Sequence, residues 1–116
     1  MIEQTNAVSP PLITVLMPIY NSPNVIASVN SVLEQDYGAI ELILIDDGSC
    51  NFSANDMRSY LEIHAGHNLR NWRIIENTKN LGTVRSLNRG IRLSHGEIIF
   101  NLAGDDLFSD GRVLSD

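Results

Sequence analysis

Two pairs of adjacent aspartates are the residues of this 116-residue chain best suited to carry chemistry. Asp46-Asp47 directly follows the apolar run at residues 40–45, and Asp105-Asp106 comes shortly after a second run at residues 97–102. If both runs are parallel strands, the acidic pairs lie at one edge of the sheet, where open α/β proteins bind ligands. Carboxylates gathered there repel one another unless a cation or hydrogen-bond donors offset their charge. The pattern therefore favours a binding site, and a divalent cation is a natural partner for its carboxylates.

Each acidic pair also has a purely structural explanation. Asp46-Asp47-Gly48-Ser49 is good turn chemistry and could cap the next helix. Asp105-Asp106 could be a charged loop at a strand end. For either pair alone the two explanations are equally good, and the occurrence of both pairs after strands favours a site.

Three further residues are weaker candidates. Tyr20 follows the first apolar run, where it could stack on a flat base or simply pack at the rim of the domain. Asn80 and Gly82 fit a loop with unusual backbone angles, and equally an ordinary connection.

The basic residues do not form an obvious phosphate site. The segment from Pro18 to Pro23 has neither Gly-x-Gly-x-x-Gly nor Gly-Lys-Ser/Thr, so dinucleotide-binding and P-loop sites are not expected. Of three arginines around the third predicted helix, Arg85 could face the cleft, while Arg89 and Arg92 are predicted to lie on a solvated face.

The elements that must position these residues alternate along the chain. A continuous strand-forming run predicts a buried strand at residues 12–17, and mostly apolar segments predict further strands at residues 40–45 and 97–102 and a short one at residues 72–75. Pro18 is expected to end the first strand, and Ser22 and Pro23 to form the N-cap and first position of a helix. A second helix is predicted over residues 54–65. A third carries an apolar stripe of Val84, Leu87 and Ile91.

This order predicts an α/β fold, Rossmann-like and doubly wound. A mostly parallel sheet lies between two layers of helices, giving three α/β/α layers. Residues 1–11 are interpreted as a flexible lead-in and residues 12–116 as one domain. Because no further element is predicted after Asp106, we expect the chain to be the front portion of a longer protein.

Composition excludes several classes of function. The net charge of −6 and pI of about 4.8 argue against a general nucleic-acid binder or a binder of anionic membranes. A single cysteine, Cys50, allows no internal disulfide and no cysteine zinc cluster. Neither a signal peptide nor a membrane segment is predicted from the sequence.

In order and spacing, several short motifs resemble the nucleotide-binding half of a family 2 glycosyltransferase of the GT-A fold, from about Pro11 to Leu114. The first is the stretch Val15 to Asn21, and the second runs from Ile43 to Ser49. Asn80-Leu81-Gly82, Asn88-Arg89-Gly90-Ile91, Gly96-Glu97-Ile98-Ile99 and Gly104-Asp105-Asp106 complete the set.

The resemblance implies roles for individual residues. Tyr20 would lie against the nucleotide base, usually uracil, and Asp47 would accept a hydrogen bond from that base. Asp46 would support the same loop. Asp105 would reach the ribose or help to hold the metal, and Asp106 would ligate the Mn²⁺ or Mg²⁺ that bridges the diphosphate. The expected nucleotide-binding set is completed by Pro18, Asn21, Asn80, Gly82 and Arg85.

Two departures from the family pattern affect what can be expected. Many relatives carry another aspartate two residues before the final acidic pair, where this chain has Ala103. The acceptor-binding half and its carboxylate general base would follow Asp116. We therefore expect donor binding by this chain, and inverting sugar transfer to a hydroxyl only in the full-length parent.

The implied partners are a nucleotide-sugar donor, a UDP-sugar above all, and a saccharide or lipid-linked saccharide acceptor. Bacterial polysaccharide biosynthesis in the cytoplasm, at the inner face of the membrane, is the setting the resemblance implies, and an exposed sheet edge could support a homodimer. One alternative is a non-catalytic nucleotide-binding or interaction module of the same fold. Another is a Mg²⁺-binding receiver-like signalling domain, although the only lysine is Lys79.

Overall fold

A computed structural model describes residues 10–104 and 106–114. Strands and helices alternate along the described chain, as the apolar patterning predicts. The strands are β1 (Ile13–Ile19), β2 (Ile40–Asp46), β3 (Leu69–Glu76) and β4 (Ile98–Asn101). The helices between them are α1 (Val25–Leu33), α2 (Ala54–His64) and α3 (Thr83–Leu93).

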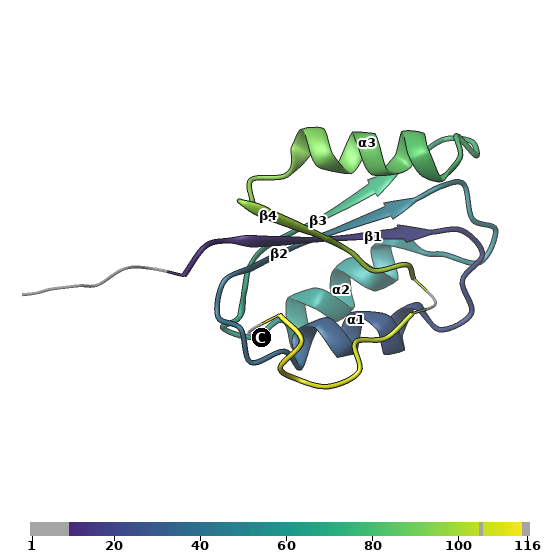
Figure 1. The fold of residues 1–116 in the computed structure, drawn as a ribbon. Coiled ribbons are helices and arrows are strands. Elements are labelled where there is room, and N and C mark those ends of the chain that lie inside the picture. Colours follow the sequence, from purple (N-terminus) through teal and green to yellow (C-terminus); the bar gives the residue numbers. More distant parts are fainter. Residues whose placement is uncertain (1–9, 105, 115–116) are drawn as a thin grey trace, which may run out of the picture.

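The four strands form one sheet of order β3-β2-β1-β4, and every pairing in it is parallel. Helices α1 and α2 cover one face of this sheet and α3 covers the other (Figure 1). The expected α/β fold with three layers is therefore confirmed. A receiver-type sheet would have the order 2-1-3-4-5, so the strand order also argues against the signalling alternative.

The core lies on both faces of β1 and β2. All seven residues of β2 are buried, as expected for a central strand of a parallel sheet. Val15, Met17, Leu42 and Leu44 pack with the α1–α2 side, whereas a smaller cluster around Ile43 lies beneath α3. Burying one such side chain stabilises the fold by about 1.5–3 kcal/mol.

The start of α1 and the end of β1 differ from the sequence-based expectation. Pro18 does not end β1, which continues to Ile19. Proline has no N–H to donate, but no hydrogen bond between strands is lost at Pro18, because the pairing of β1 with β4 ends at Leu16. The helix begins at Val25 with Asn24 as N-cap, so Ser22 and Pro23 belong to the preceding turn.

Of the predicted apolar stripe of α3, Leu87 packs partly buried against the cluster around Ile43, and the other two residues do not. Val84 and Ile91 are exposed, and the buried residues of the helix are Ser86 and Gly90. A β-carbon at position 90 would lie 3.0 Å from side-chain atoms of both Leu16 and Ile45. The closest approach to the sheet therefore uses small residues, with Leu87 and Leu93 packed beside them and Val84 and Ile91 facing outward.

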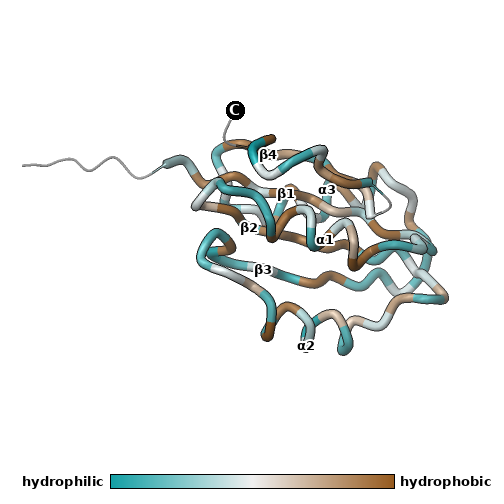
Figure 2. The backbone as a smooth tube through the Cα atoms, turned by 90° about the horizontal axis from the view of Figure 1, so that it is seen from below, coloured by the Kyte–Doolittle hydropathy of each residue, from teal (hydrophilic) through white to brown (hydrophobic). Residues whose placement is uncertain are grey.

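The last strand is exposed, although its apolar composition predicts a buried strand. β4 lies at one edge of the sheet beside β1 (Figure 2), and all four of its residues are exposed. Ile98, Ile99 and Phe100 thus leave apolar surface and unpaired backbone groups at this edge.

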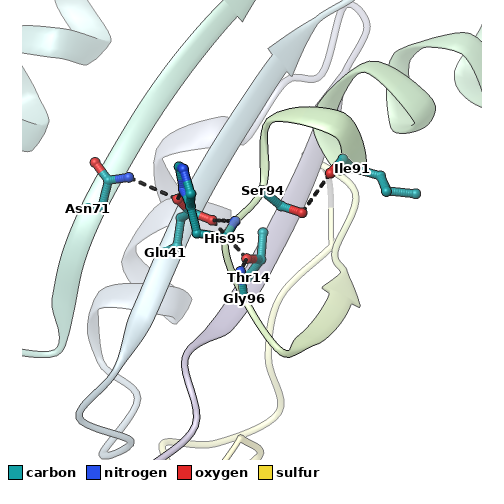
Figure 3. Close-up of polar contacts among 7 residues, drawn as sticks. All are labelled: Thr14, Glu41, Asn71, Ile91, Ser94, His95 and Gly96. Carbon is teal, nitrogen blue, oxygen red and sulfur yellow. Dashed lines mark hydrogen bonds and ion pairs between the residues drawn. The ribbon is translucent and has the colours of Figure 1, made fainter.

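Glu41, in β2, ties β4 and the end of α3 to the sheet (Figure 3). Its carboxylate is 1% exposed and accepts hydrogen bonds from Thr14 Oγ1 (2.8 Å), Asn71 Nδ2 (2.8 Å) and the His95 N–H (2.8 Å). The His95 ring nitrogen Nδ1 lies 2.7 Å away, and the Gly96 N–H donates to Thr14 Oγ1. Burial alone would raise the pKa of Glu41, but these partners outweigh it and lower the pKa below its ordinary 4.5.

A Glu41→Gln substitution should therefore show a pH-dependent cost. At neutral pH we expect the free energy of unfolding to fall by about 3 kcal/mol, because hydrogen bonds to a buried charge are lost. The lowered pKa makes this contribution complete above about pH 4.5 and diminishes it as the pH falls through the folded-state value. Urea unfolding of wild type and Glu41→Gln between pH 3 and 7 measures the difference in their unfolding free energies. A difference that stays constant as the pH falls would contradict this account.

Candidate functional site

A cavity of about 170 Å³ opens at the carboxyl ends of β1 and β2. Its position is the one at which open parallel sheets bind ligands. The structure brings Pro18, Tyr20 and Asp47 from the predicted set together around it. The remaining lining residues are Ile19, Ser22, Thr83, Ser86 and Ala103.

The loop after β1 is braced against the loop after β2. Asn21 adopts a left-handed backbone conformation with φ of 50°. Its N–H donates to Ser49 Oγ at 2.9 Å, and its side-chain Oδ1 accepts from the Cys50 N–H at 2.9 Å. This reciprocal pair fixes the turn that carries Tyr20, whose side chain is 54% exposed and free to meet a flat ligand.

Asp46 supports the loop that follows it. Its carboxylate accepts a hydrogen bond from the Ser49 N–H at 3.1 Å, which is a local turn contact. Its main-chain oxygen accepts from the Asn77 N–H at 2.8 Å. Asp46 is buried beside the cavity and outside its lining, so its contacts are those of a supporting residue.

Asp47 organises the loop between β3 and α3. Its Oδ1 accepts hydrogen bonds from the Leu81 N–H (2.7 Å) and from Asn77 Nδ2 (2.9 Å), and its Oδ2 accepts from the Gly82 N–H (3.0 Å). Burial alone would raise the pKa of this carboxyl, but these donors and the Ser86 hydroxyl lower it below the ordinary 3.8. The side chain is 5% exposed and reaches the cavity as a charged acceptor.

Asn80 and Gly82 lie in the loop that Asp47 holds. Gly82 has φ of 90° and is the N-cap residue of α3, and its N–H also contacts Asn80 Oδ1 at 3.0 Å. The unusual backbone angle expected for this loop is therefore present at Gly82. Arg85 is exposed on α3 and is not among the residues that line the cavity.

Gly48 lets the Asp47 loop touch the Asn80 loop, and Gly48→Ala should break that contact. Gly48 has φ of 80°, and an added β-carbon would lie 2.9 Å from the Asn80 nitrogen. We expect a loss of about 2 kcal/mol in unfolding free energy, from backbone strain and the clash together. Thermal unfolding measures the loss, and an unchanged Tm would show that the two loops do not approach this closely.

Sequence inspection missed Asn77, Ser86 and Arg89. Asn77 Nδ2 donates to both Asp47 Oδ1 and Ser86 Oγ, each at 2.9 Å. Arg89 Nη1 donates to Asn77 Oδ1 at 2.5 Å, so Arg89 is not a purely solvated residue as predicted. The available signal was that Asn77 directly follows β3, at the same edge of the sheet as the aspartates.

The chain after β4 returns to the same edge. The Gly104 N–H donates to the Pro18 carbonyl at 2.9 Å, and Ser28 Oγ donates to the Gly104 carbonyl at 2.9 Å. Asp106 follows with an exposed side chain, and Asp105 lies outside the described residues. Within the described ranges, no group of three His, Cys, Asp or Glu side chains could hold a metal ion.

A larger cavity of about 460 Å³ lies between α1 and α2, and it shares Ser22 with the first. Its lining includes Phe52, Met57 and Tyr60 of the α2 region. Tyr20, Asp46, Asp47 and Asp106 do not line it, so the smaller cavity is the better candidate site. None of the helices in the described part of the chain has the length and hydrophobicity needed to cross a bilayer.

The fold is that of the GT-A glycosyltransferases. A mannosyltransferase from Pyrobaculum calidifontis, solved with GDP-Man and Mn²⁺, superposes with a TM-score of 0.75 at 28% identity. That match covers 85% of this chain and 29% of the other. Staphylococcus aureus TarS 1-349 in complex with UDP gives a TM-score of 0.76 over 90% of this chain and 30% of that one, at 23% identity, which is evidence of shared fold.

The chain belongs to glycosyl transferase family 2, whose sequence profile matches residues 14–115. It is 30% identical over 98 residues to an uncharacterized glycosyltransferase of Haemophilus influenzae, covering 84% of this chain and 29% of that protein. It is 29% identical over 103 residues to glycosyltransferase GlyG of Streptococcus pneumoniae, covering 88% and 33%. The chain therefore spans about a third of the length of these relatives.

Proposed function

We propose that this chain is the donor-binding part of a glycosyltransferase and that it binds a nucleoside diphosphate sugar, with UDP as the preferred nucleotide. The observation that carries the proposal is the cavity at the carboxyl ends of β1 and β2, lined by Pro18, Tyr20 and Asp47 in a family 2 chain. Complexes of the structural neighbours with GDP-Man and with UDP support a nucleotide-sugar donor.

Each residue has a distinct part in this proposal. The exposed ring of Tyr20 stacks on the base, and Asp47 accepts a hydrogen bond from a base N–H. Asn21 and Asp46 hold the two loops that present them, and Asn80 and Gly82 shape the third side. Arg85, whose side chain is exposed on α3, would approach the phosphates.

A divalent Mg²⁺ or Mn²⁺ fits the donor chemistry of the acidic end of the chain. Asp105 and Asp106 would hold it, since Mg²⁺ sites commonly combine one or two carboxylates with substrate phosphates. Such an ion would neutralise the charge of the leaving diphosphate, which an acidic chain of net charge −6 is poorly equipped to do. Ala103 provides no carboxylate at the neighbouring position that lines the cavity.

The transfer step itself is assigned to the full-length parent. We propose inverting attack by an acceptor hydroxyl, activated by a carboxylate base beyond Asp116. The acceptor is a saccharide or lipid-linked saccharide of polysaccharide biosynthesis, and the parent acts in the cytoplasm at the inner face of the membrane. For this chain alone we propose donor binding without transfer.

Calorimetric titration tests the donor proposal. UDP should bind with a Kd in the high micromolar to millimolar range, and binding should strengthen about tenfold with Mg²⁺ or Mn²⁺. ADP and GDP serve as matched nucleotides of equal phosphate charge. Equal affinity for UDP, ADP and GDP would contradict recognition of the base. A UDP affinity that is the same with and without metal would contradict the role of Asp105 and Asp106.

A non-catalytic module of the same fold is the second candidate, favoured by Ala103 in place of a metal-binding aspartate. This second candidate predicts a folded chain that binds no nucleotide, with or without Mg²⁺ or Mn²⁺. The exposed β4 edge supports a homodimer as a property of this chain, and sedimentation at increasing concentration would detect it.

A further inference from the structure

We propose that Arg89 and Asn77 are positioning residues for the donor site, which together fix the Asp47 carboxylate and the loop that closes the cavity. This inference rests on the proposed function, because it treats the Asp47 cavity as the place where the base binds. Neither residue lines the cavity, so both act through Asp47.

Asn77 occupies the centre of a buried relay. Its side chain is 5% exposed, and its amide nitrogen Nδ2 donates to Asp47 Oδ1 and to Ser86 Oγ at 2.9 Å each. Its backbone N–H donates to the Asp46 carbonyl at 2.8 Å. Asn77 therefore joins the end of β2 to the first turns of α3.

Arg89 and Asp47 favour the same orientation of the Asn77 amide, from opposite sides. A guanidinium has only donors, so the atom that faces it must be the amide oxygen, and Arg89 Nη1 lies 2.5 Å from Asn77 Oδ1. The amide NH₂ is thereby turned toward Asp47, which has only acceptors when ionised. Without Arg89, Asp47 is the remaining group that favours this orientation, because the Ser86 hydroxyl can either donate or accept.

The relay is strengthened by charge at both ends. A cation donates to the amide and the amide donates to an anion, so each hydrogen bond polarises the next. Arg89 on α3 reaches Asp47 through the Asn77 amide. The other charged residues beside the Asp47 turn are Asp46 at the end of β2 and Lys79, whose backbone would lie 3.0 Å from a β-carbon at Gly48. Arg89 also contacts the Glu76 carbonyl at 3.5 Å, which keeps it over the end of β3.

The orientation of Asp47 affects the cavity through the loop that precedes α3. Asp47 also accepts from the Leu81 and Gly82 N–H groups, which lie directly before α3. If the carboxylate turns, this loop loses its anchor and Thr83 at the cavity wall moves with it. Ordering these groups before the nucleotide arrives lowers the entropy cost of binding.

Arg89→Met tests the proposal, with Arg92→Met as the matched control. Methionine keeps much of the apolar stem and removes the donor, and Arg92 is an exposed arginine on the same helix. We expect Arg89→Met to weaken UDP binding about tenfold and Arg92→Met to leave it within about twofold. Arg89→Lys, which retains a charged donor, should recover most of the affinity.

The second readout is the titration of Asp47, followed by the ¹³C signal of its carboxyl group in the 116-residue chain. Arg89→Met should raise the pKa of Asp47 and shift the amide signals of Leu81 and Gly82, effects that a loss of packing alone would not produce. Equal Asp47 titrations in Arg89→Met and Arg92→Met would overturn the proposal.

The two proposals fail in different ways. If the wild-type chain binds no nucleotide, the proposed function fails, and the Asp47 titration still decides whether Arg89 and Asn77 position the carboxylate. If wild type binds UDP and Arg89→Met binds it equally well, the positioning role fails and the donor site stands. If Arg89→Met does not fold, Arg89→Ala carries the same titration comparison, with Arg92→Ala as its control, because alanine also removes the donor and is a strong helix former.

Discussion

Replacing Asp47 by asparagine is expected to weaken UDP binding by about a hundredfold or more. The carboxylate accepts from Leu81, Gly82 and Asn77 at 2.7–3.0 Å, and an asparagine there must turn an NH₂ group toward at least one of these donors. The base would meet a neutral side chain, and the loop before α3 would lose its anchor. Hydrogen bonds to a charged group are worth about 1.5–3 kcal/mol each, so the free energy of unfolding should also fall by about 3 kcal/mol.

Asp36→Asn is the matched control for this substitution. Asp36 is exposed at the other end of α1, and the same chemical change there should leave both stability and UDP affinity within experimental error. Affinity should be measured at a temperature where urea titration shows Asp47→Asn to be folded. A folded Asp47→Asn variant that binds UDP like wild type would place the nucleotide elsewhere.

Gly96→Ala is expected to have the largest effect on stability. Gly96 lies before β4, where its N–H donates to Thr14 Oγ1 at 2.9 Å. An added β-carbon would lie 2.6 Å from the Thr14 nitrogen and 3.0 Å from the Leu12 carbonyl oxygen, and neither backbone atom can move without disturbing β1. We expect a loss of at least about 3 kcal/mol, since the clash also breaks the cluster around Glu41.

Gly38→Ala provides the internal comparison for that result. Nothing lies within 4 Å of a β-carbon built at Gly38, so alanine there should change the unfolding free energy by about 0.5 kcal/mol or less. Urea unfolding of both variants separates the steric effect from the general effect of losing a glycine. Similar values for the two would show that Thr14 and Gly96 are not in close contact.

The fold was predictable because its signals are local and strong. β2 is mostly apolar and buried throughout, and the polar residues at its end mark the end of the strand. The errors came where tertiary contacts override pattern. β4 reads as a buried strand but lies exposed at the sheet edge, and α3 turns Val84 outward because Ser86 and Gly90 pack on the sheet.

Only some residues of the candidate site could be predicted from the sequence. Tyr20 and Asp47 could be placed because strand ends meet at one edge. Asn77 and Arg89 could not, because an asparagine in a loop and an arginine on a helix commonly have other roles. Only the folded geometry brings Arg89 within hydrogen-bonding distance of the Asn77 amide oxygen. Their importance depends on contacts between residues twelve and thirty positions apart in the chain.

Amide NMR spectra of the chain titrated with UDP, with and without Mg²⁺, test the central claim most directly. The proposed site predicts shifts centred on Tyr20, Asp47 and Gly82, with additional shifts near Asp106 when the metal is present. UDP should produce them at lower concentration than ADP or GDP. A well-dispersed spectrum that no nucleotide changes, or shifts confined to the α1–α2 cavity, would contradict a donor site at the carboxyl ends of β1 and β2.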